Sequence, residues 1–355
     1  MKSYNNLYET LISDDNIRCA IINASRSHMK RKKLKRMGAY PEFFIDEVRD
    51  WIINYKPKHH NPKIINDGIS AKKREIIVPT IQEHVVQHAV MLVLKPIFMK
   101  GMYEHSYASV PQRGCHRGAK VVKKWIKHDE RNIKYCLKLD VRKYFQSVSQ
   151  DILIGKLNKI IRDKHFMALL ENIIHVIPQG LPLGFYTSQW FANFYLQDFD
   201  HYIKEKLGAK HYIRYMDDMV IFDSNKKRLH EIKDSIVKYL RNDLALSLKG
   251  NWQVFRFDTR QHKGRFLDFM GFRFYRSKTT LRRKIALKAM RKAKRIFDKH
   301  KTTVHDARQM LTYIGWSKVT DTFNWLHNYI LIYINFRRLR KQISRYDRKA
   351  VIICG

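Results

Sequence analysis

HYIRYMDDMVIF, residues 211–222, joins two apolar runs through a Met-Asp-Asp tip. This pattern predicts a β-hairpin whose turn carries Asp217 and Asp218. Adjacent carboxylates at a hairpin tip repel each other and gain nothing structurally unless a cation lies beside them. By itself such a pair is more typical of a solvated turn than of a metal site. Asp14-Asp15, which has no flanking strand pattern, is interpreted as surface.

A third carboxylate, Asp140, favours the metal site over the solvated turn. Asp140 lies at the end of an alternating apolar and polar run, YCLKLDV at 135–141, and opens the pattern DxxxYF. A strand ending in Asp140, together with the hairpin tip 77 positions later, can place three carboxylates on one sheet edge. Three carboxylates suffice to bind two Mg²⁺ ions roughly 4 Å apart. One ion would lower the pKa of an attacking 3′-hydroxyl, and the other would neutralise a leaving pyrophosphate.

The composition indicates a polyanionic partner. The chain has 355 residues with 70 Lys and Arg against 32 Asp and Glu, a formal net charge of +38, yet 45% of it is hydrophobic. A folded protein with this charge repels itself unless a polyanion neutralises it. Nucleic acid is therefore the first expectation and an anionic membrane surface the second. Small acidic binding modules, collagen-like chains and disulfide scaffolds are excluded.

Four cysteines lie far apart without a CxxC pair, which speaks against a zinc finger and fits a reducing compartment. The first residues show no signal-peptide pattern, and no apolar stretch approaches the roughly 20 residues of a membrane span. We therefore expect a soluble, cytoplasmic protein without a membrane partner.

The remaining patterns predict an α+β core followed by a basic helical module. Strand-like runs occur at 74–78 and 266–275, and helical spacing occurs at 85–96, 152–161 and 187–207. From residue 277 onward the chain holds 20 Lys and Arg against four Asp and no Glu, a net charge of +16.

The order DxxxYF, GxxxSQ, YMDD and a strand pair containing Gly271, spread over residues 70–275, resembles the reverse transcriptases. The resemblance implies a right-hand polymerase fold, with fingers and an antiparallel-sheet palm in residues 1–275 and a basic α-helical thumb in residues 276–355. It also implies an RNA-directed DNA polymerase that copies a template RNA from dNTPs, with two Mg²⁺ ions, onto a primer.

The same resemblance assigns site residues. Asp140, Asp217 and Asp218 would be catalytic and bind the metal ions, with the Val141 carbonyl as a further ligand. Phe145 would be the steric gate that packs against the sugar and excludes a 2′-hydroxyl. An ordinary core aromatic is the alternative for Phe145.

Three basic residues would contact the nucleotide. Arg74 and Lys72 would hold the triphosphate, because a guanidinium can bind phosphate oxygens bidentately. A solvated charge cluster is the alternative. Lys249 occupies a position where the family often keeps a lysine that could protonate pyrophosphate.

A narrower resemblance points to the reverse transcriptases of diversity-generating retroelements. Many reverse transcriptases carry QGxxxSP, but here Leu183-Gly184 and Ser188-Gln189 give LGxxxSQ, and these four residues would lie at the nucleotide. In that group the cDNA is error-prone at template adenines. Leu183 would loosen base selection, because leucine offers shape where glutamine offers a hydrogen bond worth about 1–3 kcal/mol. A plain core leucine is the alternative.

One position departs from the group: Glu83-His84 stands where an Asp-Arg pair is expected. The group implies a small basic accessory protein and a bacterial or phage-encoded chain. Two alternatives remain open. One is another prokaryotic reverse transcriptase, of the defence-associated, retron or intron type. The other is a non-catalytic RNA-binding protein on the same fold.

The basic module suits a thumb that grips the template–primer backbone, since phosphate contacts position nucleic acid without reading its sequence. The residues expected to bind nucleic acid form a stripe at helical spacing: Arg282, Arg283, Lys284, Lys288, Arg291, Lys292 and Arg295.

Overall fold

The computed structural model describes residues 3–26, 31–66, 73–261, 263–299 and 302–352. The chain divides into two compact units, each built from three segments. Unit 1 comprises Met1–Glu104, Val141–Leu207 and Asp234–Gly250. Unit 2 comprises His105–Asp140, Gly208–Lys233 and Asn251–Gly355. A thumb beginning at residue 276 stays a prediction.

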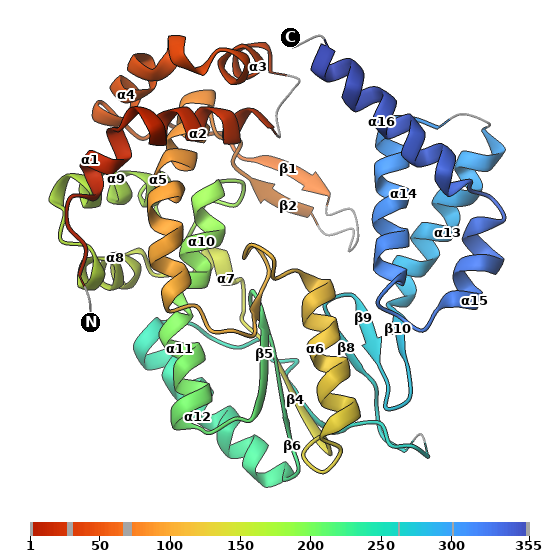
Figure 1. The fold of residues 1–355 in the computed structure, drawn as a ribbon. Coiled ribbons are helices and arrows are strands. Elements are labelled where there is room, and N and C mark those ends of the chain that lie inside the picture. Colours follow the sequence, from red (N-terminus) through yellow and green to blue (C-terminus); the bar gives the residue numbers. More distant parts are fainter. Residues whose placement is uncertain (1–2, 27–30, 67–72, 262, 300–301, 353–355) are drawn as a thin grey trace. The chain divides into compact units, whose positions relative to one another are not determined.

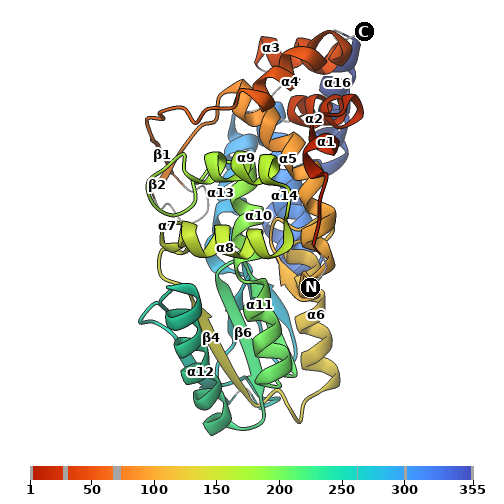
Figure 2. The same cartoon turned by 90° about the vertical axis from the view of Figure 1, so that its left-hand side faces the viewer.

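Unit 1 is mainly helical, and a two-stranded hairpin with exposed residues projects from its helices (Figure 2). The hairpin pairs β1 (Lys63–Asn66) with β2 (Lys73–Ile76). The helices before it are α1 (Leu7–Ile12), α2 (Asp14–Arg26), α3 (Lys32–Ala39), η1 (Pro41–Phe44) and α4 (Ile45–Ile53). Those after it are α5 (Ile81–Lys100), α7 (Tyr144–Ser147), α8 (Gln150–Ile160), α9 (Lys164–Ile174), α10 (Tyr186–Tyr195), α11 (Gln197–His201), η2 (Tyr202–Lys206) and the second part of α12 (Lys226–Leu244).

Helix α5 is the central helix of unit 1, with buried residues from Glu83 to Phe98. Val85, Val86, Ala89 and Val90 are all fully buried, and the helix contacts α2 and α10. The predicted helical spacing ends at Pro96, whereas α5 continues four residues further, to Lys100. The predicted helix at 187–207 is divided into α10, α11 and η2. Between α10 and α11 the backbone leaves helical geometry at Leu196 (ψ 4°).

Unit 2 contains a five-stranded sheet in the order β3-β5-β6-β4-β7, antiparallel except between β3 and β5. Helix α6 (Cys115–His128) lies along the sheet (Figure 1), and its Ala119, Val122 and Ile126 join the apolar core. The strands are β3 (Ser106–Tyr107), β4 (Tyr135–Asp140), β5 (His211–Tyr215), β6 (Asp218–Asp223) and β7 (Gln253–Arg256).

The rest of unit 2 is a small antiparallel sheet followed by helices with their own apolar core. Gly271 turns the chain between two strands at φ +86°, and a Cβ there would lie 2.3 Å from the Trp316 ring, so only glycine fits. The elements are β8 (Leu267–Phe269), β9 (Phe272–Phe274), β10 (Thr279–Leu281), α13 (Arg283–Asp298), α14 (Val304–Ser317), α15 (Phe323–Leu326), η3 (His327–Leu331) and α16 (Phe336–Ile352).

The predicted mixture of helices and strands is confirmed. Strands occur within each of the predicted runs 135–141, 211–222 and 266–275, and the middle run forms the expected hairpin. Within the described ranges no helix combines the length and the apolar composition needed to cross a lipid bilayer.

Candidate catalytic carboxylate site

The carboxylates of unit 2 gather at one end of its large sheet. Asp140 is the last residue of β4 and Asp218 the first residue of β6, and the two are direct partners in the antiparallel register. Such partners have Cα atoms about 4.5–5.5 Å apart. Tyr215 pairs with Asp218 on the other side, which leaves Met216 and Asp217 as the turn. All three predicted aspartates therefore lie at the same strand ends.

A buried arginine, which the sequence reasoning did not single out, holds this turn. Met216 has a positive φ of 56°, and its N–H donates to the Tyr107 carbonyl at 3.3 Å. The Arg214 side chain is completely buried, and its Nη1 donates to the Met216 carbonyl at 3.0 Å. The only signal in the sequence was a cation inside the apolar run of the first hairpin strand.

Electrostatics make an ionised Asp218 unfavourable in the protein alone. The pKa of this carboxyl is raised to about 7, mainly by desolvation and also by the neighbouring Asp140 and Asp217, against the opposing effect of Lys138. The Lys138 Nζ lies 3.4 Å from Asp218 Oδ2. The other oxygen, Oδ1, is buried and finds no hydrogen-bond partner among the described residues.

These observations fit a hard divalent cation. Carboxylate oxygens are the ligands that Mg²⁺ prefers, and an unsatisfied buried oxygen beside two further carboxylates favours a positive charge. Within the described ranges, no group of three or more His, Cys, Asp or Glu side chains is drawn together closely enough to hold a metal ion. The strand ends thus supply suitable oxygen donors without forming a closed ligand cage.

A cavity of about 270 Å³ borders Asp140 on the same sheet. Lys138 and Asp268 are part of its lining, and Lys138 Nζ donates to the Asp268 carbonyl at 2.6 Å. Asp268 in turn accepts from Arg282 Nε at 2.6 Å. Lys138 is therefore held between this network and the carboxylate at the start of β6.

Unit 1 contains the segment that follows Asp140. Val141 is fully buried and forms a bridge with Leu248, which places Lys249 next to that bridge. In the Tyr144-Phe145 pair, Tyr144 is the core aromatic, and its hydroxyl donates to the Ala192 carbonyl at 2.5 Å. Phe145 is only half-buried, which weakens the alternative that it is an ordinary core residue.

The loop around Leu183 and Gly184, predicted to lie at the nucleotide, is hydrogen-bonded to the end of the β1–β2 hairpin. The Leu183 carbonyl accepts from the Ile77 N–H at 2.7 Å, just beyond β2, which carries the exposed Arg74. A Cβ on Gly184, at φ +109°, would lie 2.1 Å from the Ile77 carbonyl oxygen, so this contact requires glycine. Leu183 is half-buried and Gln189 is exposed, whereas Ser188 is buried and donates to the Pro182 carbonyl at 2.7 Å. Lys72 lies outside the described residues.

The segment around Phe145 and this loop are also hydrogen-bonded to each other within unit 1. The Leu181 N–H donates to the Phe145 carbonyl at 2.7 Å. Gly180, at φ +77°, lies against the same carbonyl, since a Cβ there would come within 2.5 Å of it. The structure therefore brings Phe145, Leu183 and the end of β2 into one hydrogen-bonded group.

The departure at Glu83 has a structural reason. Its carboxylate accepts from the Thr80 N–H at 2.8 Å while Thr80 Oγ1 accepts from the Glu83 N–H at 3.2 Å, which forms a capping box at the start of α5. The other Glu83 oxygen lies 2.7 Å from His60 Nε2. Glu83 is buried and serves the helix terminus.

The predicted basic stripe follows α13, but its members differ in surroundings. Arg282, the N-cap residue, is paired with Asp268, and Lys292 is buried and paired with Asp306. Lys288 is half-buried. The exposed members of the stripe are Arg283, Lys284, Arg291 and Arg295.

Comparison with known proteins is consistent with this geometry. Residues 56–270 match the family described as reverse transcriptase (RNA-dependent DNA polymerase). The group II intron-encoded protein LtrA of Lactococcus lactis is 24% identical over 211 residues, covering 57% of this chain and 33% of LtrA. The retron Ec73 reverse transcriptase of Escherichia coli is 25% identical over 193 residues, covering 50% of this chain and 58% of that protein.

Solved structures share the fold. Apo telomerase from Candida tropicalis superposes with a TM-score of 0.53 at 13% identity, covering 85% of this chain and 62% of that chain. The complex of this telomerase with a TWJ fragment of telomeric RNA gives 0.52 at 12% identity, covering 88% and 61%. The fold is thus the right-hand polymerase fold. The chain belongs to the reverse transcriptase family, and it spans about a third to three-fifths of the length of LtrA and the retron enzyme.

Proposed function

We propose that this chain is an RNA-directed DNA polymerase that binds a template RNA and a primer and extends the primer with dNTPs. The observation that carries the proposal is the half-buried Asp218, partnered in register with Asp140, with one buried carboxylate oxygen that finds no hydrogen-bond partner among the described residues. A binding module gains nothing from repelling carboxylates at a place where phosphates approach. Family membership supports the same reading.

Asp140, Asp217 and Asp218 would hold two Mg²⁺ ions, with the Val141 carbonyl as a further ligand. Bound Mg²⁺ supplies activation of the 3′-hydroxyl and charge neutralisation at the leaving pyrophosphate. Buried Arg214 keeps the turn that carries Asp217 in position.

In unit 1, the half-buried Phe145 would act as the sugar gate. Arg74 would hold the triphosphate together with Lys72, and Lys249 would protonate the pyrophosphate. Support for these roles comes from the exposure of Arg74 and from the hydrogen bonds that join Phe145, Leu183 and the end of β2.

Primer extension on RNA with purified protein tests the proposal. Asp218→Asn should abolish synthesis, because the amide removes the charge that the cation needs, while RNA affinity is retained. Asp223→Asn, at the other end of the same strand, is the matched control and should remain active. A wild-type protein that binds RNA but extends no primer, alone or with an accessory protein and its native RNA, would favour the non-catalytic alternative.

We further propose that the enzyme belongs to the diversity-generating class and misincorporates opposite template adenines, with a small basic accessory protein as partner. The supporting observation is the half-buried Leu183 in the loop attached to β2, together with the Ser188-Gln189 pair. Retron and intron types fit the comparisons equally well.

Sequencing of the cDNA separates these classes. Substitutions concentrated at template adenines, and reduced in Leu183→Gln, are the expected result. Rare errors spread evenly over the four template bases would instead favour the retron or intron type. An adenine bias that persists unchanged in Leu183→Gln would keep the class but remove Leu183 as its cause.

A further inference from the structure

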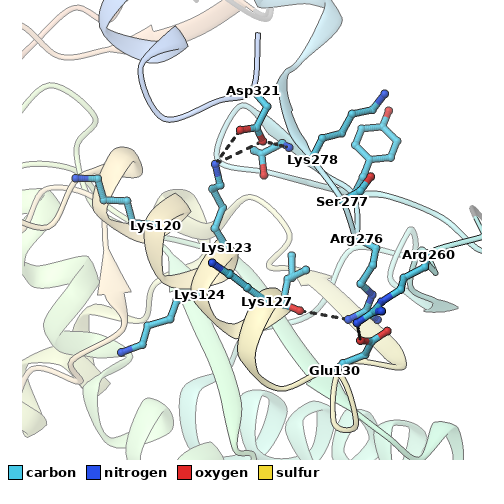
Figure 3. Close-up of a pocket in the computed structure, with 13 residues that line it drawn as sticks. Lys120, Lys123, Lys124, Lys127, Glu130, Arg260, Arg276, Ser277, Lys278 and Asp321 are labelled. Carbon is cyan, nitrogen blue, oxygen red and sulfur yellow. Dashed lines mark hydrogen bonds and ion pairs between the residues drawn. The ribbon is translucent and has the colours of Figure 1, made fainter. Parts of the chain in front are cut away.

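A second cavity of unit 2, of about 680 Å³, is lined mainly by cations (Figure 3). Helix α6 supplies one wall, and the segment around Tyr275–Thr279 supplies another. Seven basic and two acidic side chains line it, an excess of five positive charges. The charged residues are Lys120, Lys123, Lys124, Lys127, Arg260, Arg276, Lys278, Glu130 and Asp321.

Some of these basic residues make hydrogen bonds or ion pairs within unit 2. Arg276 donates to the Asp258 carbonyl at 3.1 Å and to the Ile126 carbonyl at 3.4 Å, which ties the end of α6 to the sheet. Arg260 pairs with Glu130 at 2.9 Å. Lys123 Nζ lies 3.5 Å from an Asp321 carboxylate oxygen. The two carboxylates of the cavity are therefore each engaged by one cation.

Three lysines of α6 remain available. Lys120, Lys124 and Lys127 are exposed, and no ion pair in the described part of the chain involves them. They recur at i, i+4 and i+7, so they lie on one helix face over about 10 Å of axial rise. Figure 3 shows Lys120 and Lys124 extending outward from α6, with Lys278 at another margin of the cavity.

This cavity is distinct from the carboxylate site. Arg276 donates hydrogen bonds to the carbonyls of Ile126 and Ile133. Ile133 lies just before β4, which begins at Tyr135 and ends at Asp140. The five residue steps from Tyr135 to Asp140 separate the two ends of the strand by roughly 16–17 Å. A phosphate at the floor of the cavity is thus not one bound at the catalytic aspartates.

The chemistry of the lining favours a phosphodiester backbone over an acidic protein. Stable protein interfaces are anchored by exposed aromatic or aliphatic side chains. None of the large hydrophobic side chains exposed in the described ranges lines this cavity. Flexible lysine ammonium groups instead make point-charge contacts with phosphates, independent of base sequence.

We propose that the α6 lysines and the adjoining cavity form a second nucleic-acid site, which binds the phosphate backbone of a strand segment away from the catalytic carboxylates. RNA and single-stranded DNA share this chemistry. The site does not depend on catalysis, and it anchors a segment that the polymerase does not copy at that moment.

The test is equilibrium binding of a single-stranded RNA of about 20 nucleotides, titrated with salt in EDTA. The variant carries Lys120→Gln, Lys124→Gln and Lys127→Gln. Each lost phosphate contact lowers the magnitude of the slope of log K against log [salt] by about 0.7, so the expected decrease is about 2. Affinity at moderate salt should fall on the order of tenfold.

The matched control removes an equal number of positive charges from α12. It carries Lys226→Gln, Lys227→Gln and Lys238→Gln, all at exposed positions. Its slope should stay at the wild-type value. Circular dichroism melting verifies that both variants fold. An equal loss in both variants would show that only the total charge matters and would overturn the proposal.

Acetylation protection locates the contact. Bound RNA should shield Lys120, Lys124 and Lys127 from acetylation, as read by peptide mass spectrometry, and leave Lys226 reactive. Equal shielding by single-stranded DNA would establish a general backbone site, and shielding by RNA alone would establish an RNA site. Shielding by poly-glutamate at the same charge concentration, or none by either nucleic acid, would overturn the proposal. Neither assay involves DNA synthesis, so failure here leaves the polymerase proposal intact.

Discussion

Asp218 destabilises the metal-free fold in a pH-dependent way. A carboxyl whose pKa is raised on folding, here to about 7 by burial and by Asp140 and Asp217, binds its proton more tightly folded than unfolded. The ionised form therefore costs stability, and this cost grows as pH rises from the unfolded value of about 4 toward 7.

We expect Asp218→Asn to melt several degrees higher than wild type in EDTA near pH 8. The gap should narrow near pH 5, where protonation neutralises the wild-type carboxyl. Thermal unfolding at the two pH values measures this, with Asp223→Asn as the strand-matched control. A gap of equal size at both pH values would assign the effect to packing rather than to charge.

Arg214 carries the second prediction at this scale. Arg214→Met keeps most of the volume but leaves the Met216 carbonyl without its 3.0 Å donor, so stability should fall by about 1–3 kcal/mol. Primer extension should fall on the order of 100-fold, because a small displacement of the turn misplaces Asp217. Urea unfolding and single-turnover extension measure the two effects. Wild-type turnover in a folded Arg214→Met protein would refute a positioning role.

The roles of these residues could be predicted from the sequence to different extents. Asp140, Asp217 and Asp218 could be picked out because strand patterns end at them, and the register brings them to one end of the sheet. Arg214 and Glu83 could not be assigned, because their roles lie in contacts with backbone groups that tertiary structure supplies.

At the scale of elements, alternation and hairpin signals located β2, β4, β5, β6, β8 and β9, since the two-residue period is set by the sheet itself. They did not locate the short strands β1, β3, β7 and β10. Helix ends were less predictable. Helix α5 runs through Pro96, and the 187–207 segment is interrupted at Leu196. Both outcomes depend on what surrounds the helix, which spacing alone does not encode.

Asp306, at the junction of α13 and α14, should affect stability in the opposite direction to Asp218: its ionised carboxylate stabilises the fold. Hydrogen bonding to Lys292 is the main cause that lowers the pKa of Asp306 to about 2, and Thr303 adds to it through the capping box of α14. A depressed pKa stabilises the fold above the unfolded value of about 4, and this contribution is lost as pH falls toward 2.

Asp306→Asn should therefore cost about 1–2 kcal/mol near pH 7, and the difference from wild type should shrink near pH 3. Denaturant unfolding at the two pH values measures it. The exposed Asp298→Asn, at the end of α13, is the control and should show little difference at either pH. A cost that is constant with pH would contradict the ion-pair explanation.

For the whole molecule, the net charge of +38 sets the response to salt. Screening shortens the reach of charge from about 10 Å at 0.1 M to about 3 Å at 1 M. Screening weakens the exposed ion pairs, each worth about 0–1 kcal/mol, which lowers stability. It also weakens the mutual repulsion of the 70 Lys and Arg, which the 32 Asp and Glu do not balance, and this raises stability. Repulsion should dominate, because the excess charge is larger than the local pairs can offset.

Raising NaCl from about 0.1 M to about 1 M should thus increase the melting temperature by roughly 2–4 °C, the shift that 1 kcal/mol produces in a domain of 150–250 residues. A short RNA at low salt should produce a larger increase, which NaCl then removes by competing for the same cations. An uncharged osmolyte at equal osmolality controls for solvent effects. A melting temperature that falls with NaCl in the free protein would mean that its ion pairs outweigh its net charge, and the polyanion would then not be needed for charge balance.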